Sequence, residues 1–254
     1  MELGLKGRIA VVTGGGKGIG AGISKALASE GVKVLLTCNS NPQMAEGTAD
    51  QIRQEGGEAE VFCGDVGSRE KVDEMMEMAV DRFGGIDILV NNAAWQPNLD
   101  IDEYSEEYYD QIMNTNLGGY FRCIQASIPY LKKSKCPRII NISSVHGKRP
   151  SDFDVGYSMT KGGIKMLVRE AAIELGEFGI TVNAILPGGI KIEFKSGYTA
   201  PMKRKRIERP RKYQYYRGAG MPKDVADLVL YLVSQNGGHI TGASIRLDGG
   251  AMLY

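Results

Sequence analysis

The sequence has few of the residues that build metal centres and covalent frameworks. Its 254 residues include two histidines and four cysteines, and the cysteines are scattered, with no CxxC pair. This scattering is typical of a reduced cytosolic protein, so we expect neither a disulfide framework nor a bound metal. The cysteines are Cys38, Cys63, Cys123 and Cys136, and the histidines are His146 and His239.

Long hydrophobic runs and an excess of charge are missing as well. No apolar stretch approaches the ~18 residues that span a bilayer, and the apolar run near the N-terminus is too short for a signal peptide. We therefore expect a cytoplasmic protein without membrane contact. The net charge of +1 argues against a general affinity for nucleic acid.

The chain does contain a regular alternation of apolar runs and helix-period segments. The runs are apolar on both faces, as in strands buried between two helical layers. They lie at residues 8–13, 33–37, 59–63, 86–92, 138–143, 180–186 and 243–247, and helix-period segments include 18–30, 68–83 and 162–178. This order predicts an α/β fold, a doubly wound parallel sheet of Rossmann type with helices on both faces. No linker or repeat interrupts it, so we expect one domain over residues 1–254.

A glycine-rich turn, TGGGKGIG, follows the first predicted strand and opens the first predicted helix. Gly14, Gly18 and Gly20 would let the backbone turn tightly and approach a pyrophosphate, which then rests on the helix N-terminus. The spacing differs from the GxGxxG dinucleotide fingerprint. A tight strand-to-helix turn that binds nothing is the alternative.

Together with six later motifs, this turn resembles the short-chain dehydrogenase/reductase family along nearly the whole chain. The motifs are NNAA (91–94), NTN (114–116), ISS (142–144), YSMTK (157–161), PGG (187–189) and DGG (248–250). The general resemblance is greatest to 3-oxoacyl-carrier-protein reductases and to sugar or polyol dehydrogenases. It implies hydride transfer between a nicotinamide cofactor and a carbonyl or alcohol substrate.

Tyr157 and Lys161 are the residues we expect to carry the proton chemistry. They stand at i and i+4, so on a helix their side chains face the same way. The lysine ammonium should lower the pKa of the tyrosine hydroxyl from its usual value of about 10, which would allow proton exchange near neutral pH. A chance YxxxK, expected roughly once in such a chain, is the alternative.

The resemblance adds two residues to the catalytic set and a second role for Lys161. Ser144 would orient the substrate oxygen, and Asn116 would hold a water that links Lys161 to solvent. Lys161 would also bind the nicotinamide ribose. Taken singly, Ser and Asn are common at strand ends and helix starts, so their spacing from Tyr157 carries this assignment.

The resemblance also implies a set of cofactor contacts at the ends of the predicted strands. The set is Gly14, Lys17, Gly18, Ile19, Gly20, Cys38, Asn39, Asp65, Val66, Asn92, Ala93, Tyr157, Lys161, Pro187, Gly188 and Ile190. Two positions depart from the family pattern. Ala94 replaces the glycine of NNAG, and Ile192 replaces a threonine that often contacts the carboxamide.

The residues after the second predicted strand bear on the choice of cofactor. NAD enzymes place a carboxylate there for the ribose hydroxyls, whereas this chain has Cys38, Asn39 and Ser40. Lys17 resembles the basic residue that NADP-using members carry in the glycine loop. We therefore favour NADP(H) over NAD(H).

Trp95, Ser144 and His146 fall where the family lines its substrate pocket. A core tryptophan and a surface-loop histidine are ordinary alternatives. Residues 188 to about 220 form a long polar segment that we interpret as a substrate lid. Within it, 195–212 carries eight basic residues and one acidic residue. A solvated face, nucleic-acid binding or nuclear targeting, and an anionic substrate all fit such a run.

Two further expectations concern partners and function class. The resemblance implies a homotetramer that packs through the helix carrying Tyr157 and through the C-terminal strand region. It also implies a small or carrier-bound carbonyl substrate in place of nucleic acid. A dinucleotide-binding regulator with little turnover is the alternative function. The complete set of Asn116, Ser144, Tyr157 and Lys161 argues against it, because a sensor has no need of a tuned tyrosine.

Overall fold

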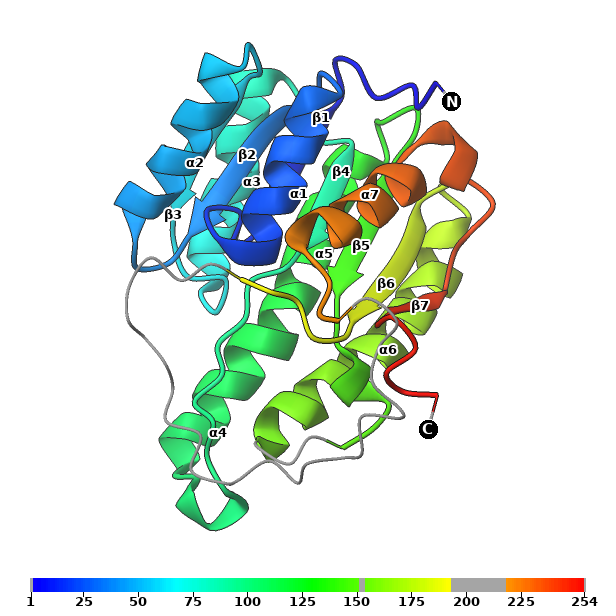
Figure 1. Ribbon diagram of the computed structural model, residues 1–254. Helices are drawn as coiled ribbons and strands as arrows, with labels where there is room; N and C mark the ends of the chain where they lie inside the picture. Colours follow the sequence, from blue (N-terminus) through cyan, green and yellow to red (C-terminus); the bar gives the residue numbers. More distant parts are fainter. Residues whose placement is uncertain (1, 151–153, 193–217, 254) are drawn as a thin grey trace.

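The seven predicted strands form one parallel sheet in the computed structural model, which describes residues 2–150, 154–192 and 218–253 (Figure 1). The sheet order is β3-β2-β1-β4-β5-β6-β7. The strands are β1 (Ile9–Val12), β2 (Lys33–Cys38), β3 (Ala59–Cys63), β4 (Ile88–Asn91), β5 (Arg138–Ile142), β6 (Thr181–Pro187) and β7 (Ser244–Leu247). The strand order reverses between β1 and β4, which is where doubly wound sheets bind ligands. The predicted fold class is confirmed.

Helices cover both faces of this sheet. The larger helices are α1 (Gly18–Ser29), α2 (Pro42–Gln54), α3 (Arg69–Phe83), α4 (Glu106–Met113), α5 (Gly119–Leu131), α6 (Val155–Gly176) and α7 (Pro222–Val233). Helices α1, α2 and α7 lie on one face, and α3, α5 and α6 lie on the other. Helix α4 projects away from the sheet at the bottom of Figure 1. Short turns of 3-10 helix are η1 (Ile101–Glu103), η3 (Val145–Gly147) and η5 (Gln235–Gly237).

Because helices cover both faces of the sheet, the strand sequences do not alternate between apolar and polar residues. In β1, Val11 packs against the core under α3, α5 and α6. Its neighbours Ala10 and Val12 pack against the core under α1, α2 and α7. All three are fully buried, so both faces of the strand require apolar side chains.

Local signals set the helix ends. The Ser68 side chain accepts a hydrogen bond from the backbone of Lys71 and caps α3, and Gly84 ends this helix in the left-handed region. These are the residue types that helix ends favour. Helix α6 begins at Val155, earlier than the predicted start at 162, because Asp154 caps it.

No helix among the described residues is long and apolar enough to cross a membrane. Most of the expected lid, residues 193–217, lies outside the described residues. The two flanks of that segment are joined, since Lys191 donates from its backbone N to the carbonyl of Gly220 at 2.7 Å. In the part of the chain that the structure describes, no three or more His, Cys, Asp or Glu side chains come together in a group that could hold a metal ion.

Candidate active site

The glycine loop between β1 and α1 has a conformation that side chains would not tolerate. Gly14 and Gly18 have φ values of 62° and 52°, in the left-handed region that favours glycine. A Cβ on Gly20 would lie 2.1 Å from the carbonyl oxygen of Gly14. The loop therefore requires glycine at the three positions predicted to approach a pyrophosphate.

Three side chains hold this loop in place, and two of them, Thr13 and Thr48, were not singled out by the sequence. The hydroxyl of Thr13 accepts from the backbone N of Asn92 at 2.9 Å and of Ala93 at 3.0 Å. The Asn92 amide in turn donates to the carbonyls of Thr13 and Gly14. Thr48 on α2 donates to the carbonyl of Gly16 at 3.0 Å. Asn92 and Ala93, predicted as cofactor contacts, thus lie against the loop and fix its shape.

Helix α1 presents its first turn beside this loop. Its N-cap residue, Lys17, is exposed and makes no side-chain capping bond, and Ile19 is half-buried in the first turn. An uncapped helix N-terminus offers backbone N–H groups and a favourable dipole to an anion. This is the position that a pyrophosphate requires.

The ends of β2 and β3 form the next part of the site. Asn39 is exposed and Cys38 half-buried at the end of β2. After β3, the Asp65 carboxylate accepts from the backbone N of Gly67 at 2.8 Å. Val66 is buried and packs where a Cβ on Gly119 would clash. These four predicted cofactor contacts, which the family resemblance assigns to the adenosine half of the cofactor, therefore lie at one edge of the sheet.

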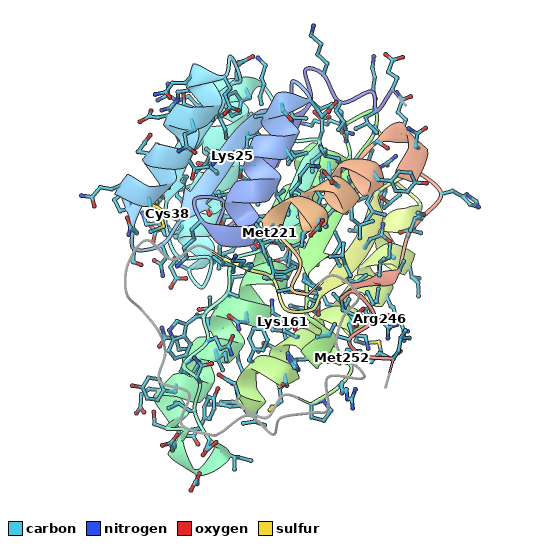
Figure 2. The ribbon with its side chains drawn as sticks, in the orientation of Figure 1. Lys25, Cys38, Lys161, Met221, Arg246 and Met252 are labelled. Atoms are coloured by element: carbon cyan, nitrogen blue, oxygen red, sulfur yellow. A yellow bond between two sulfur atoms is a disulfide. The ribbon has the colours of Figure 1, made fainter. Side chains whose placement is uncertain are left out.

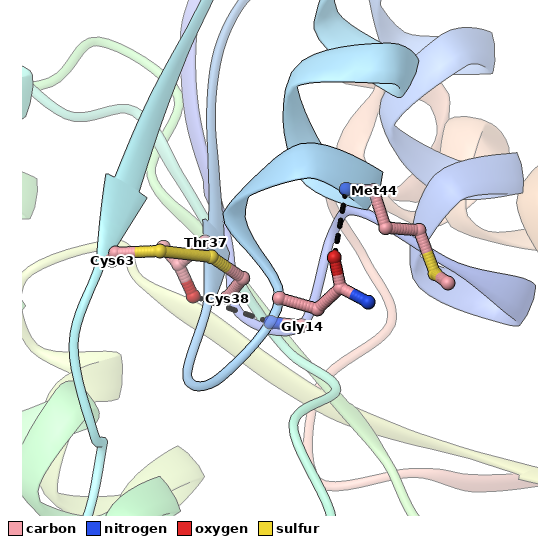
Figure 3. The surroundings of a disulfide bond; sticks show 6 residues. Gly14, Thr37, Cys38, Met44 and Cys63 are labelled. Carbon is pink, nitrogen blue, oxygen red and sulfur yellow. Dashed lines mark hydrogen bonds between the residues drawn. A yellow bond between two sulfur atoms is a disulfide. The ribbon is translucent and has the colours of Figure 1, made fainter.

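Two cysteines at this edge contradict the expectation of fully reduced thiols. Cys38 and Cys63 form a disulfide with their Cα atoms 4.9 Å apart, beside the bond from the backbone N of Gly14 to Thr37 (Figure 3). The two residues are 25 positions apart in sequence but face each other in the parallel register of β2 and β3. The spacing of the two cysteines in the sequence does not reveal this register. The expectation that both thiols are reduced was therefore wrong for Cys38 and Cys63. Cys123 and Cys136 are free thiols.

The loop after β6 approaches the glycine loop from the other side. The backbone N of Gly188 donates to the carbonyl of Leu247 at 2.9 Å, and a Cβ on Gly188 would lie 2.8 Å from that of Asp248. The PGG motif, from Pro187 onward, and the DGG motif therefore pack together. Further along, Ile190 forms a bridge with Gly220.

Ile192 lies close to the first turn of α1. A Cβ on Gly18 would lie 3.3 Å from the Ile192 side chain. The position where the family resemblance leads us to expect a threonine thus presents an apolar group toward the glycine loop.

Tyr157 and Lys161 lie one turn apart in α6, as the spacing predicted. The Lys161 ammonium lies 5.4 Å from the centre of the Tyr157 ring. It donates to the carbonyl of Ile142 at 2.8 Å and contacts the Tyr120 hydroxyl at 3.4 Å. Tyr120 also donates to that carbonyl, at 2.9 Å. Lys161 lies near the middle of Figure 2, buried beyond the end of β5.

Tyr120 is a site residue that the sequence did not reveal. It lies on α5 and is among the largest fully buried side chains. A tyrosine in a helical segment resembles ordinary core, and only the packing of α5 against β5 brings its hydroxyl to Lys161.

The pKa values differ from the simple expectation for this pair. Burial raises the pKa of the Tyr157 hydroxyl; a hydrogen bond from Ser144 lowers it, and the charge of Asp154 raises it. Burial also lowers the pKa of Lys161 to about 7. The predicted lowering of the Tyr157 pKa by Lys161 is therefore wrong in direction, because loss of water around the phenol outweighs the other effects. A phenol with a raised pKa keeps its proton and can donate it.

Asn116 lies in a π-helical turn, η2 (Asn114–Gly118), between α4 and α5. Such turns occur often at functional sites. Its fully buried side chain accepts from the backbone N of Trp95 at 2.7 Å and donates to the Trp95 carbonyl at 2.8 Å. Asn116 therefore clamps the loop after β4. The relay water that the resemblance assigned to Asn116 stays a prediction.

The predicted substrate residues lie in the chain segments that follow β4 and β5. Ser144 is buried at the end of β5, where its hydroxyl accepts from the backbone N of His146 at 3.2 Å. His146 is half-buried in η3. The Trp95 ring stacks on Tyr108 of α4, with the ring centres 5.8 Å apart. Trp95 is thus half-buried in the loop after β4 and is not part of the sheet core.

Known proteins resemble this chain along nearly its whole length. The family model described as enoyl-(acyl carrier protein) reductase matches residues 14–252. Glucose 1-dehydrogenase 2 of Bacillus subtilis is 34% identical over 252 residues, covering 98% of this chain and 96% of that protein. The 3-oxoacyl-acyl-carrier-protein reductase of Staphylococcus epidermidis is 33% identical over 244 residues, covering 96% and 98%. A crystal structure of a short chain dehydrogenase from Burkholderia cenocepacia in complex with NADP has 30% identity and a TM-score of 0.88, covering 97% and 98%.

The chain belongs to the short-chain dehydrogenase/reductase family. It is accordingly an NAD(P)-dependent oxidoreductase that acts on a CH–OH group. The glycine loop fits the cofactor of this family, since Gly14 and Gly18 take left-handed φ values and the N-terminus of α1 beside them has no side-chain cap. The relatives are named for different substrates, a sugar and an acyl-carrier thioester, so the family alone leaves the substrate of this member open.

Proposed function

We propose that the protein reduces a carbonyl compound with NADPH, or runs the reverse oxidation, with Tyr157 as the proton-transferring residue. One observation carries the proposal. Ser144 lies close enough to the Tyr157 hydroxyl to lower its pKa, and Tyr157 stands one helical turn before a fully buried lysine. Two hydroxyls that meet in this way can both bind one substrate oxygen.

Each residue of the set has a distinct task in this reaction. Bound nicotinamide supplies or accepts the hydride, which no side chain can carry. Ser144 donates a hydrogen bond that orients the substrate oxygen, and Tyr157 gives that oxygen a proton as negative charge develops on it. Lys161, with its pKa lowered to about 7, can hold or release a proton near neutral pH. Asn116 keeps the Trp95 loop in place beside them.

The choice of NADP(H) rests on charge at the end of β2. Asn39 and Ser40 are exposed there, and neither would repel a 2′-phosphate as a carboxylate would. Lys17 is exposed at the start of α1 and supplies positive charge to the same region. The NADP complex of the related Burkholderia cenocepacia protein supports this preference.

We further propose an anionic substrate, small or carrier-bound. The reason is the charge of residues 195–212, with eight basic residues and one acidic residue. Fixed charges of one sign near a cleft raise the local concentration of an oppositely charged substrate. This segment lies outside the described residues, so its charge alone supports the proposal.

A homotetramer is the assembly we propose. An apolar hollow on the α5 and α6 side is lined by Met113, Leu117, Gly118, Phe121, Gly163, Met166 and Leu167. Phe121 and Met166 are 52% and 55% exposed. Exposed apolar side chains grouped in this way mark a contact surface, and Met166 lies on the helix that carries Tyr157.

Oxidation of NADPH and NADH with a panel of carbonyl compounds tests the proposed reaction, cofactor and substrate charge together. The panel pairs each neutral ketone or aldehyde with a carboxylated or phosphorylated counterpart. We expect kcat/KM to be at least about tenfold higher with NADPH, and the KM of the charged substrate to rise with salt because screening weakens exposed charges.

Each part of the proposal fails separately in this assay. Absence of turnover with both cofactors would contradict the enzyme function. A higher kcat/KM with NADH would overturn the cofactor preference alone. A KM that changes neither with salt nor with the charge of the substrate would contradict the proposal of an anionic substrate.

A further inference from the structure

A buried carboxylate outside the predicted catalytic set joins two parts of the site. Asp154 is 3% exposed and stands directly before α6. Its Oδ1 accepts from the backbone N of Tyr157 at 2.8 Å and from the Tyr104 hydroxyl at 2.6 Å. Its Oδ2 accepts from the backbone N of Asn98 at 3.0 Å. One side chain thus ties the first turn of the catalytic helix to the loop between β4 and α4.

The backbone around this carboxylate is adapted to it. Asn98 has a φ of 59° and is the one non-glycine residue with positive φ among those the structure describes. That conformation costs free energy in a residue with a side chain, and the bond to Asp154 holds it. On the helix side, a Cβ on Gly156 would lie 2.5 Å from the Tyr104 hydroxyl. Glycine at 156 therefore admits this hydroxyl to the start of α6.

The loop that Asp154 holds also carries Trp95. Asn116 binds the backbone of Trp95 at one end of the loop, and Asp154 binds Asn98 and Tyr104 further along. The loop follows β4 at the edge of the sheet where ligands bind in this type of fold. Its shape is therefore set from the same elements that carry the proton-transfer residues.

We propose that Asp154 is a positioning residue that fixes Tyr157 and shapes the substrate-facing loop through Tyr104 and Asn98. The inference rests on the proposed role of Tyr157 as the proton donor. Two effects follow from the geometry. Loss of the network would loosen the substrate wall, and loss of the negative charge would lower the pKa of Tyr157, which that charge raises.

Other groups face Tyr157 from the elements packed around it. Lys161 lies on the same helix, Tyr120 reaches in from α5, and Ser144 comes from the end of β5. The variants below leave all three unchanged. A shift in the pH profile therefore reports the charge on Asp154.

The test compares Asp154→Asn, Tyr104→Phe and a capping control, Ser68→Ala. Ser68 lies after β3, on a different part of the site from Tyr157 and Asp154, and caps α3 by accepting from the backbone of Lys71 at 3.3 Å. Asp154→Asn should raise the KM of the carbonyl substrate roughly tenfold, the value of one hydrogen bond to a charged group. It should also move the alkaline fall of kcat to lower pH, because a phenol with a lower pKa loses its proton earlier. The KM of NADPH should stay within about twofold.

The other two variants separate positioning from simple stability. Tyr104→Phe keeps the charge of Asp154, so we expect a higher KM for the carbonyl substrate with the pH profile of kcat unchanged. Ser68→Ala should lower the thermal midpoint and leave KM and the pH profile as in the wild type.

Two results would overturn the inference. If Asp154→Asn and Tyr104→Phe match Ser68→Ala in KM and in pH profile while the wild type turns over, Asp154 is a structural cap and no more. If the wild type itself shows no turnover, the proposed function fails and this inference fails with it. The activity of the wild type distinguishes the two cases.

Discussion

The two ends of the site are built in different ways. At the reaction end, Asn116, Ser144 and Lys161 are buried and are held by hydrogen bonds to neighbouring backbone and side chains. At the adenosine end, Lys17 and Asn39 are exposed. A disulfide and backbone bonds hold that edge in shape. Under the proposed function, the interior would set the chemistry, and a few surface side chains would select the cofactor.

The largest effect should come from the proton donor at the reaction end. Tyr157→Phe keeps the ring and removes the hydroxyl whose pKa Ser144 lowers. We expect kcat to fall at least ~10²-fold, the usual contribution of a positioned acid or base. Steady-state turnover of NADPH with any substrate found in the carbonyl panel measures it. Activity within a few-fold of the wild type would exclude Tyr157 as the proton donor.

A smaller effect is expected from a charge placed at the adenosine end. Cys38→Asp puts a carboxylate at the end of β2, where it would repel a 2′-phosphate and accept bonds from ribose hydroxyls. We expect the ratio of kcat/KM for NADPH to that for NADH to fall roughly tenfold or more. Cys38→Ser is the matched control, because it also removes the disulfide with Cys63 but adds no charge. An equal fall in both variants would assign the effect to the lost disulfide.

The smallest effect is on stability, and it comes from the buried lysine. Lys161 has its pKa lowered from 10.5 to about 7, so the unfolded chain binds more protons between these values. Wild-type stability should therefore rise with pH across that range, and the cost of burying the amine is fully present below it. Lys161→Met removes this cost, and the Ile142 carbonyl keeps its bond from Tyr120.

We accordingly expect Lys161→Met to melt a few degrees higher than the wild type near pH 6, with the difference closing toward about pH 10. Thermal unfolding at several pH values measures it, with Lys165→Met on the same helix as the control. A variant that melts lower than the wild type at every pH would show that the lysine stabilises the fold.

Local periodicity explains what could be predicted of the site. Strand runs and helix segments predicted the doubly wound sheet because each strand is buried on both faces. The spacing of Tyr157 and Lys161 placed them on one helix face because four residues make about one turn. The glycine loop could be predicted for a similar reason, since left-handed backbone and close approach both require glycine there.

Features that depend on packing between distant segments were missed. The disulfide between Cys38 and Cys63 needs the register of β2 and β3, which no local pattern encodes. Tyr120 resembled a core tyrosine until α5 was placed over β5. The sign of the Tyr157 pKa shift depends on how deeply the fold buries its hydroxyl, and sequence spacing says nothing of that depth.

The division of the site into a reaction end and an adenosine end is tested most directly by titrating NADPH into the wild type, Tyr157→Phe and Cys38→Asp, with the fluorescence of the bound nicotinamide as the signal. Because Tyr157 acts on the substrate oxygen, we predict that Tyr157→Phe binds NADPH with a Kd within a few-fold of the wild type. Cys38→Asp should bind it at least about tenfold more weakly. A Kd that is unchanged in Cys38→Asp and strongly raised in Tyr157→Phe would contradict the account.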